Sequence, residues 1–322
     1  MNLLVTGAAG FIGSHFVLRH IENFSNDKIV VLDKLTYAAD KSFLDSVSDK
    51  IKFVEGDIAD KEIVDKLVKD NGINVIINFA AESHVDRSIS DASPFIHTNV
   101  IGTQNLAEVC RDNDVFLFHV STDEVYGDLS DDEPPKKIDD LLNPSSPYAA
   151  SKAAAEMMVK AAVRTYGIKA CISRCTNNFG PHQAEEKFLP TVIRHALKDE
   201  PVPIYAEGKN KRDWLYVTDH TDAIEMILQK RGQTPFMDSK MCYKCNIFNI
   251  SADDEKENIE VAKAILDILG KPHSLLEFVE DRPGHDWRYA IDSSETKKLG
   301  WSPKVSFETG LADTVEWYVK RL

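Results

Sequence analysis

The chain has 322 residues, of which 43% are hydrophobic and 28% are charged, a balance typical of a globular protein. This length suits one large domain or a domain with a smaller lobe. The net charge of −14 predicts a surface that repels nucleic acids and anionic membranes, so neither is expected as a partner. No apolar run is long enough to predict a transmembrane helix.

The N-terminus and the cysteines indicate the compartment. The apolar run Leu3–Val5 has no basic leader and stops at Gly7, so no secretion signal is expected. The five cysteines are sparse and odd in number, which favours free thiols over a disulfide framework. The sequence therefore predicts a reducing, cytoplasmic environment.

Apolar runs alternate with amphipathic stretches through the first half of the chain. This alternation predicts a parallel sheet covered by helices on both faces, which is a Rossmann-like, doubly wound α/β fold. The expected strands are Leu3–Val5, Ile29–Leu32, Ile51–Val54, Val75–Phe79, Phe116–Val120 and Ala170–Ser173. The expected helices are Ile12–Asn23, Lys61–Asn71, Pro94–Arg111 and Pro147–Tyr166.

The pattern loosens after Asn177, which indicates a smaller C-terminal lobe. We expect a first domain over residues 1–176 and a lobe mainly over 177–322, with some elements crossing back. The Asp- and Pro-rich stretch Gly127–Pro147 and the stretch Arg231–Lys244 are expected to be loops. The short elements expected in the lobe are the helices Leu189–Leu197, Thr218–Gln229 and Ile259–Leu269 and the strands Ile204–Tyr205, Phe248–Ile250 and Leu276–Val279.

The segment Gly7–Gly13 places glycines at Gly7, Gly10 and Gly13, between the first strand and the first helix. Glycines let backbone N–H groups approach a pyrophosphate, and the N-terminus of a helix favours its negative charge. A plain tight turn is the alternative, but the strand–turn–helix context favours a dinucleotide site that includes Phe11 and Ile12.

Two acidic residues end the second and third strands. Asp33 follows the glycines by about twenty residues, where an acid binds the ribose hydroxyls of a dinucleotide and repels a 2′-phosphate, so NAD is expected rather than NADP. Asp57 has two interpretations. One, implied by the family resemblance given below, places it near the adenine of the cofactor. In the other it caps a helix, since Asp57 and Asp60 both precede a helical pattern.

Tyr148 and Lys152 form a Tyr-x-x-x-Lys pattern, which puts both side chains on one face of a helix. A nearby ammonium stabilises a phenolate, and the phenolate can take a hydroxyl proton as hydride leaves the same carbon. An ordinary surface pair is the alternative. The position of the pair, shortly after the fifth strand of a glycine-rich α/β domain, favours the catalytic interpretation.

Thr122, Asp123 and Glu124 directly follow the strand Phe116–Val120, where side chains enter the ligand crevice of a parallel sheet. Two adjacent carboxyl groups can act as one acid and one base if their environments separate their pKa values. An exposed acidic turn or a helix cap is the alternative interpretation.

Together these motifs resemble the extended short-chain dehydrogenase/reductase superfamily, and more closely the dTDP-glucose 4,6-dehydratase family. The resemblance spans nearly the whole chain, and residues 122–124 and 281–286 are its most specific parts. The segments that carry it are 80–88, 121–127, 177–181, 186–187, 212–214, 281–286 and 315–318.

The resemblance implies dehydration of dTDP-glucose to dTDP-4-keto-6-deoxyglucose, with NAD regenerated in each cycle. Tyr148, helped by Lys152 and Thr122, would take the proton of the 4-hydroxyl while C4 gives hydride to NAD. Glu124 would then take the C5 proton, and Asp123 would protonate the departing 6-hydroxyl before hydride returns to C6.

The resemblance also implies the binding residues, and no metal ligands are expected. The further cofactor residues are Lys34, Leu35, Thr36, Asp57, Ile58, Ala80, Ala81, Ser83, Thr98, Tyr148, Lys152 and Asn177. The substrate residues are Ser83, Thr122, Asn178, Lys187, Leu189, Arg212, Asn249, Arg282 and His285. For Lys187, Arg212 and Arg282, a surface salt bridge is the alternative.

The chain departs from the family pattern in three places. Residues 184–187 replace a more usual Phe-Pro-Glu-Lys run, Ser251-Ala252 stands where glycines usually follow, and Thr234–Cys245 is expected to be an insertion. The insertion contains a C-x-x-C pattern, Cys242 to Cys245. A zinc site needs two further ligands, so Cys245 is expected to be a small residue that begins a strand.

Other functions stay open. The same chemistry on UDP-glucose or a UDP-N-acetylhexosamine is the first alternative. The 4-epimerases of the superfamily are similar, but residues 122–124 argue against them because an epimerase expels no water. A non-catalytic NAD-binding regulator is a further alternative. By analogy, helices around Thr103–Cys110 and Tyr148–Arg164 predict a homodimer with a four-helix interface, where Ala149, Ala150, Ala153, Ala154 and Ala155 permit close approach.

Overall fold

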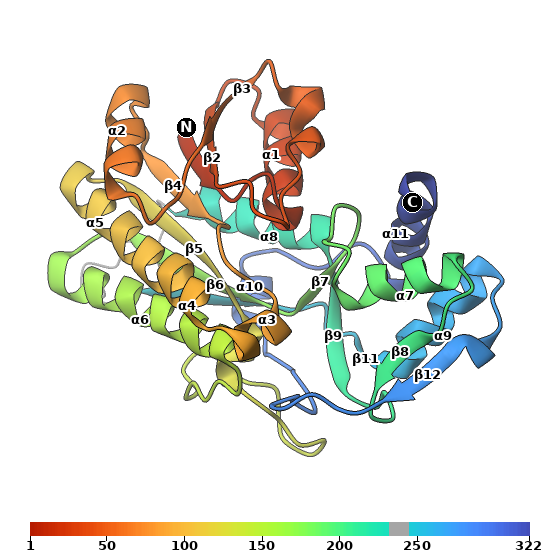
Figure 1. Cartoon of the computed structure of the whole chain (residues 1–322). Helices are drawn as coiled ribbons and strands as arrows, with labels where there is room; N and C mark the ends of the chain where they lie inside the picture. Colours follow the sequence, from red (N-terminus) through yellow and green to blue (C-terminus); the bar gives the residue numbers. More distant parts are fainter. Residues whose placement is uncertain (232–244) are drawn as a thin grey trace.

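The structure, a computed structural model, describes residues 1–231 and 245–322. Its largest element is a parallel seven-stranded sheet with the order β10-β6-β5-β4-β1-β2-β3 (Figure 1). Strands β2 and β3 are added on one side of β1, and β4 and the later strands are added on its other side. This switch between β1 and β4 creates a crevice at the carboxyl ends of these two strands. The strands are β1 (Asn2–Thr6), β2 (Lys28–Asp33), β3 (Ile51–Glu55), β4 (Val75–Asn78), β5 (Phe116–Thr122), β6 (Ala170–Cys175) and β10 (Asn246–Ile250).

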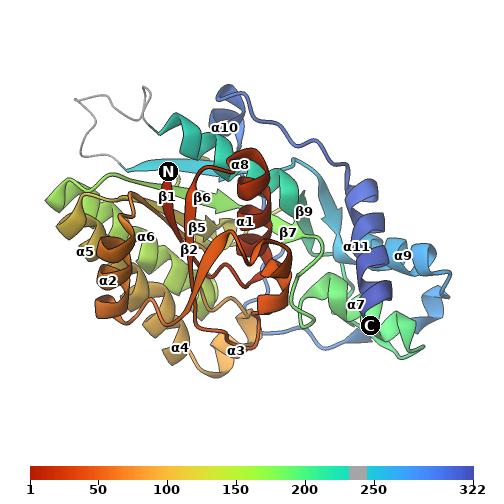
Figure 2. The ribbon, with the colours of Figure 1, turned by 90° about the horizontal axis from the view of Figure 1, so that it is seen from above.

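Helices cover both faces of this sheet (Figure 2). Neighbouring strand residues belong to opposite apolar clusters, since Leu3 and Val5 pack in one cluster and Leu4 in the other. This is why the strands are nearly continuous apolar runs in the sequence. The covering helices are α1 (Phe11–Asn23) and α8 (Val217–Lys230) on one face, and α2 (Lys61–Asn71), α5 (Thr103–Asn113) and α6 (Pro147–Tyr166) on the other.

A smaller lobe is built around a third apolar cluster, which includes Phe179, Trp214 and Tyr318. It contains a three-stranded sheet of order β11-β9-β7 and the two-stranded pair β12-β8. Its strands are β7 (Asn177–Phe179), β8 (Val202–Tyr205), β9 (Lys211–Tyr216), β11 (Glu255–Glu257) and β12 (Leu276–Val279). Its helices are α7 (Phe188–Leu197), α9 (Asn258–Leu269) and α11 (Phe307–Arg321).

Two elements of the C-terminal half pack on the large sheet. Strand β10 pairs in parallel with β6, and the side chains of α8 join the cluster of α1. The large sheet therefore depends on residues that lie far beyond its sixth strand in the sequence.

The expected helix Pro94–Arg111 is wrong as a single α-helix. The chain forms the short α4 (Ser93–Phe95), then the π-helical η2 (Ile96–Gly102), and only then α5. A π-helical segment carries an extra residue per turn and often marks a functional site. Here it presents Thr98 to a cavity described below.

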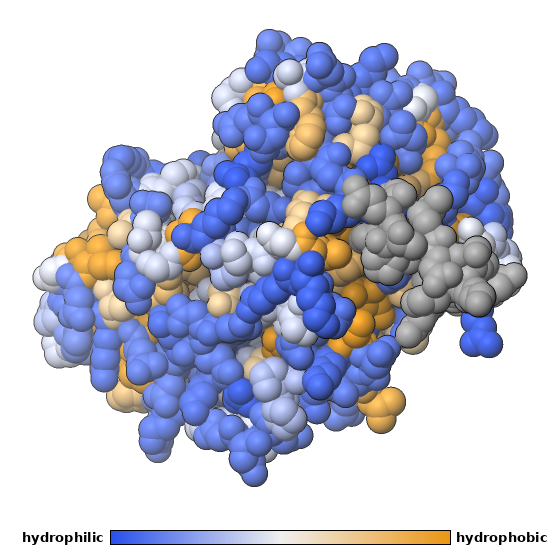
Figure 3. All heavy atoms as spheres, turned by 180° about the vertical axis from the view of Figure 1, so that it is seen from behind, coloured by the Kyte–Doolittle hydropathy of each residue, from blue (hydrophilic) through white to orange (hydrophobic). Residues whose placement is uncertain are grey.

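The remaining elements are short. They are α3 (Val85–Ser90), α10 (Ser294–Lys298) and the 3-10 helices η1 (Lys41–Val47), η3 (Asp123–Tyr126) and η4 (His273–Leu275). The surface seen from behind is mostly hydrophilic, and its apolar side chains form scattered patches (Figure 3).

The predicted insertion Thr234–Cys245, which includes Cys242, lies outside the described residues, and only its last residue, Cys245, is described. Cys245 is buried directly before β10. Across residues 1–231 and 245–322, no three potential metal-ligating side chains come together, and no helix is long and apolar enough to cross a membrane.

Candidate active site

The glycine turn between β1 and α1 forms one wall of a cavity in the crevice. Gly7 has a φ of +69°, and an added Cβ would lie 2.5 Å from the backbone nitrogen of Ala80, so only glycine fits there. A Cβ on Gly13 would lie 2.5 Å from the carbonyl oxygen of Gly7, so the absence of a side chain at Gly13 permits the close packing of α1. A Cβ on Gly10 would lie 3.3 Å from that carbonyl oxygen, a tight contact, so Gly10 also lets the turn stay close-packed.

The first turn of α1 is suited to an anion. Its N-cap, Gly10, offers no side-chain hydrogen bond, and the turn contains no acidic side chain. The N–H groups of this turn are therefore available to a ligand, and the helix dipole favours a negative charge at this point. The turn fits the pyrophosphate of a dinucleotide.

Asp33 lies at the cavity wall at the end of β2 and is only 7% exposed. Its carboxylate accepts hydrogen bonds from the backbone N–H groups of Ala9 and Leu35, both at 2.8 Å. These bonds fix its orientation, although burial raises the pKa of the carboxyl group. The position matches that expected for an acid that contacts ribose hydroxyls.

Asp57 also lines this cavity. Its carboxylate pairs with Lys34 at 2.7 Å and accepts a hydrogen bond from the N–H of Ala59. The interpretation of Asp57 as a helix cap is wrong, because the Asp60 side chain caps α2. Asp57 is thus left with a place in the cavity wall beside Lys34.

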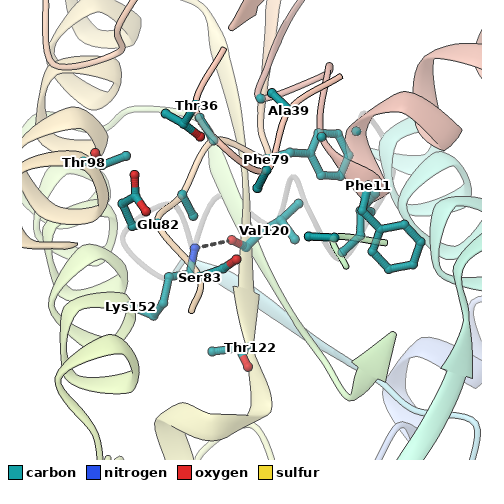
Figure 4. Close-up of a pocket in the computed structure, with 18 of the residues that line it drawn as sticks. Phe11, Thr36, Ala39, Phe79, Glu82, Ser83, Thr98, Val120, Thr122 and Lys152 are labelled. Carbon is teal, nitrogen blue, oxygen red and sulfur yellow. Dashed lines mark hydrogen bonds between the residues drawn. The ribbon is translucent and has the colours of Figure 1, made fainter. Parts of the chain in front are cut away.

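Tyr148 and Lys152 are buried on the first turns of α6, and both line the cavity, so they are not a surface pair. Lys152 Nζ donates to the carbonyl oxygen of Val120, at 2.7 Å (Figure 4). Burial lowers the pKa of Lys152 to about 8, and the nearby Glu156 carboxylate opposes this effect. Burial also raises the pKa of Tyr148, whereas its hydrogen bond with Thr122 lowers it.

The acid pair lies on η3, directly after β5. Thr122 caps this turn, since its hydroxyl accepts from the N–H of Glu124 at 3.3 Å and donates to Asp123 Oδ1 at 3.2 Å. Asp123 is only 3% exposed, and its Oδ2 has no hydrogen-bond partner within the described part of the chain. The interpretation of an exposed acidic turn is therefore wrong for Asp123.

The environments of the two carboxyl groups differ. Burial, together with the charge of Glu124, raises the pKa of Asp123 well above its usual range. Burial raises the pKa of Glu124 as well, but the positive charges of Lys187, Arg282 and Arg212 oppose this effect. The surroundings thus favour the proton on Asp123 over the proton on Glu124.

A second cavity adjoins the first and shares Glu124, Asn178 and Lys187 with it. Lys187 Nζ donates to the carbonyl oxygen of Ser83 at 2.6 Å rather than to a carboxylate. Asn178 is fixed by His220, whose ring nitrogen lies 2.9 Å from Asn178 Oδ1. The two cavities therefore meet at the acid pair.

Cationic side chains line the second cavity. Arg212 is buried and donates to the carbonyl oxygens of Lys211 and Asp286, while its guanidinium lies 4.4 Å from the centre of the Tyr289 ring. This arrangement excludes a surface salt bridge for Arg212. Arg282 pairs with Asp86 at 2.9 Å, and its buried Nε has no partner in the described structure.

The structure brings together nearly all the residues expected from the sequence. Every expected cofactor residue except Leu35 lines the first cavity. Ser83 and Thr122 also line it, and Leu189, Arg212, Arg282 and His285 line the second. Figure 4 shows Thr36, Thr98, Thr122 and Lys152 converging on the first cavity from different elements.

Asn249 is the exception among the expected substrate residues, because it lines neither cavity. It is buried in β10, where Asn249 Oδ1 accepts from the Tyr126 hydroxyl at 3.0 Å and Nδ2 donates to the carbonyl oxygen of Lys136. Its neighbours Phe248 and Ile250 pack in the cluster of α1 and α8, so the alternation of the strand directs Asn249 to the opposite face.

The sequence analysis missed two groups of cavity residues. Phe79, Cys175 and Thr176 line the first cavity near the ends of β4 and β6, and the predicted strand ends could have identified them. Tyr205 and Tyr289 line the second cavity. Tyr205 ends a strand that the sequence predicts, but its place in the cavity, like that of Tyr289, follows only from the tertiary fold.

A doubly wound parallel sheet, a glycine-rich first turn and a buried Tyr-x-x-x-Lys pair define a dinucleotide-binding protein of the short-chain dehydrogenase/reductase class. The family described as GDP-mannose 4,6 dehydratase matches residues 4–314, and the chain belongs to this family.

Individual relatives agree with this assignment. A dTDP-glucose 4,6-dehydratase of Mycolicibacterium smegmatis is 44% identical over 99% of this chain and 93% of its own length. The low-salt glycan biosynthesis protein Agl12 of Haloferax volcanii is 45% identical over 99% of both chains. The solved structure of DesIV, a dTDP-glucose 4,6-dehydratase of Streptomyces venezuelae with NAD bound, is 42% identical, has a TM-score of 0.92 and covers 99% of this chain and 97% of its own.

Proposed function

We propose that the chain catalyses the NAD-dependent dehydration of dTDP-glucose to dTDP-4-keto-6-deoxyglucose. One observation carries this proposal. The buried Asp123 and the half-buried Glu124 lie where a cavity suited to a dinucleotide meets a cavity lined by cations. A 4-epimerase has no use for an acid and a base at this position, whereas a dehydratase must remove one proton and supply another.

The first cavity supports NAD as the cofactor. The side-chain-free turn at Gly7 and Gly10, the free N–H groups of the first turn of α1 and the carboxylate of Asp33 fit its pyrophosphate and ribose. When bound, NAD supplies the hydride acceptor for oxidation at C4 and returns the hydride to C6. The other residues proposed to hold it are those expected from the sequence, without Leu35.

Tyr148 is proposed to take the proton of the sugar 4-hydroxyl. Lys152 supports this role because its ammonium group is held by Val120 and stabilises a phenolate. The nearby Thr122 hydroxyl opposes the rise in the pKa of the phenol that burial causes. Because the pKa of Lys152 is about 8, its amino group can gain or lose a proton close to neutral pH.

Glu124 is proposed to remove the proton at C5, which becomes acidic once C4 is a ketone. Asp123, with its raised pKa, is proposed to protonate the departing 6-hydroxyl. The charges of Lys187, Arg282 and Arg212 support the ionised form of Glu124. Water loss thus uses one proton acceptor and one proton donor from adjacent residues.

The second cavity is proposed to hold the nucleotide diphosphate through Lys187, Arg212 and Arg282, because guanidinium groups match phosphate oxygens. Ser83, Thr122, Asn178, Leu189 and His285 are proposed to contact the remainder of the substrate. In this scheme residues 1–176 mainly bind the cofactor and residues 177–322 mainly bind the substrate.

A homodimer with a four-helix interface is part of this proposal. Ile96 and Ile101 of η2 are 53% and 40% exposed, and Met157 of α6 is 42% exposed, beside the small side chains of Ala150, Ala153 and Ala154. A second copy of the chain would bury these apolar groups. A monomeric mass in solution would contradict this. A cytoplasmic location is proposed as well, since Cys110, Cys171, Cys175 and Cys245 are buried free thiols.

The test is to incubate the purified protein, without added NAD, separately with dTDP-glucose and with UDP-glucose, and to follow both by mass spectrometry. Loss of one water from the dTDP sugar alone is the expected result, and it also shows that a recycled cofactor stays bound. The double variant Asp123→Asn, Glu124→Gln serves as the control and should release no water.

Water loss from UDP-glucose alone would move the substrate to another nucleotide sugar. If neither sugar loses water even when NAD is supplied, the proposed roles of Asp123 and Glu124 are wrong. Epimerised sugar in place of a dehydrated product would identify an epimerase.

A further inference from the structure

A fully buried ion pair joins α6 to the sheet. Arg174 of β6 and Glu156 of α6 have side chains that are 1% and 0% exposed. Arg174 Nε lies 3.0 Å from Glu156 Oε1, and Nη2 lies 2.5 Å from Oε2. Burial of two charges is costly unless the geometry is well satisfied. Glu156 stands one helical turn beyond Lys152.

The same arginine also contacts the turn that carries the acid pair. Arg174 Nη1 donates to the Tyr126 hydroxyl, and its guanidinium lies 4.6 Å from the centre of the Tyr126 ring. Tyr126 in turn donates to Asn249 Oδ1, at 3.0 Å. Tyr126 is the last residue of η3, so the network runs from α6 through β6 to the end of this turn.

The turn η3 depends on side chains at both of its ends. A 3-10 helix of four residues has weak hydrogen bonding of its own. Thr122 caps its start, and Tyr126 is anchored at its end. Gly127, which follows, has a φ of +78°, and an added Cβ would lie 2.0 Å from the carbonyl oxygen of Asn143, so the exit of the turn is also tightly enclosed.

Tyr148 and Lys152 have separate anchors. The backbone N–H of Tyr148 donates to Ser88 Oγ at 3.1 Å, and Lys152 is held by the Val120 carbonyl oxygen. The Tyr–Lys pair thus keeps these contacts when the Tyr126 hydroxyl is removed, whereas the acid turn loses its anchor at one end. Neither Tyr126, Glu156 nor Arg174 lines a cavity.

We propose that Arg174, Glu156 and Tyr126 are positioning residues that hold the acid turn η3 in register with α6, and that they control water elimination more than oxidation at C4. This inference rests on the proposed function and deepens it. The network acts mainly through the turn that carries Asp123 and Glu124, because the three residues line neither cavity; Glu156 alone also acts on Lys152, through its charge.

The experiment uses Tyr126→Phe in the full chain, which removes one hydroxyl and keeps the ring beneath Arg174. Tyr216→Phe, in the apolar cluster of the smaller lobe, is the matched control. Water loss from dTDP-glucose should fall about tenfold to a hundredfold in Tyr126→Phe, the loss expected from a small displacement of catalytic groups. The KM for dTDP-glucose and the melting temperature should stay close to those of the control.

A rapid-mixing measurement separates the two halves of the reaction. The absorbance of reduced nicotinamide should rise at the wild-type rate in Tyr126→Phe and then persist, because elimination is slow. Arg174→Lys should show the same pattern with a larger effect, since an ammonium group lacks the planar fork that holds Glu156 and Tyr126 together.

Three results would overturn the inference. Wild-type water loss in Tyr126→Phe would remove the positioning role. Equal slowing of the absorbance rise and of water loss would show a general structural effect instead. A wild-type protein that dehydrates no nucleotide sugar would overturn the proposed function and this inference with it, whereas an active wild type with an unchanged variant overturns this inference alone.

Discussion

The two cavities that meet at the acid pair are built in different ways. The wall of the cofactor cavity consists largely of backbone turns, such as the one at Gly7 and Gly10, and of residues at the ends of adjacent strands. The substrate cavity is lined by long side chains from segments far apart in the sequence, including Lys187, Arg212 and Arg282. One cavity is encoded locally and the other is assembled only by the tertiary fold.

This difference has a physical consequence for recognition. A glycine turn at a helix N-terminus presents its N–H groups as soon as the first strand and helix pack together. The cations of the substrate cavity instead need partners that hold them before the substrate arrives. Lys187 is hydrogen-bonded to Ser83, and Arg212 to three carbonyl oxygens, so part of the cost of ordering these side chains is met in folding.

The largest expected effect concerns the junction of the two cavities. Glu124→Gln should lower the rate of water loss from dTDP-glucose by about a hundredfold or more, because an amide cannot act as the base. Reduced nicotinamide should still form, since Tyr148 and Lys152 are untouched. Stopped-flow absorbance together with mass spectrometry checks both statements.

The matched control for this variant is Glu22→Gln, an exposed glutamate in α1. It should leave both steps unchanged. If Glu124→Gln abolished oxidation at C4 as strongly as water loss, the separation of the acid pair from the Tyr–Lys pair would be incorrect.

A smaller effect would show that the two cavities bind their ligands independently. Gly10→Val adds a side chain at the wall of the cofactor cavity, with its Cβ 3.3 Å from the Gly7 carbonyl oxygen, and it should lower NAD affinity about tenfold, as for one lost contact of about 1.4 kcal/mol. Arg282→Met should instead raise the KM for dTDP-glucose by a similar factor, because it removes a charged partner of phosphate.

Calorimetric titration of NAD and steady-state kinetics should be applied to both variants. Gly10→Val should change the KM for dTDP-glucose by no more than about twofold, and Arg282→Met should change the affinity for NAD by no more than about twofold. Such small effects are expected if the two sites are independent. If Gly10→Val raised the KM of the sugar nucleotide as much as Arg282→Met does, the two cavities would not be separate binding units.

The smallest effect is a pH dependence. Lys152 has a pKa of about 8, so kcat/KM should decline as the pH rises through this value and the ammonium group is lost. Its stability contribution has the opposite trend. The folded pKa lies below the ordinary value of 10.5, so between the two the unfolded chain binds more protons, and the stability cost of burying the Lys152 charge falls as the pH rises. Kinetic profiles and melting curves over the same range would distinguish the two trends, and a kcat/KM that stays flat well above pH 8 would contradict the role of Lys152.

Much of the large sheet could be predicted from the sequence, because its strands are apolar runs bounded by helices with a regular period. The helix Pro147–Tyr166 was predicted with its observed bounds, since Pro147 and Gly167 mark its ends. The strand β9 was not predicted, because it begins with the charged residues Lys211, Arg212 and Asp213, and the burial of the last two follows only from tertiary contacts. The break of the helix after Pro94 into a π-helical segment also had no local signal.

The site divides in the same way. The positions of Gly7, Asp33 and Tyr148 in the first cavity follow from spacing alone. The positions of Arg212 and Arg282 in the second cavity were expected only from the family resemblance. That resemblance also suggested Asn249, and the alternation of β10 directs it instead to Tyr126. Neither the ion pair of Arg174 with Glu156 nor its reach to the acid turn could be recognised in the sequence, because its members are far apart.

The late return of β10 to the large sheet bears on how the chain matures during translation. Until residues 246–250 leave the ribosome, β6 remains an open edge that presents unpaired backbone N–H and C=O groups. A nascent chain that ends within the smaller lobe therefore has an unpaired edge strand that can pair with other chains. A chaperone or rapid synthesis of the remaining residues must protect this edge. A fragment that ends at residue 176 lacks β10, so β6 stays an unpaired edge. The cofactor-binding half is therefore expected to aggregate when it is expressed alone.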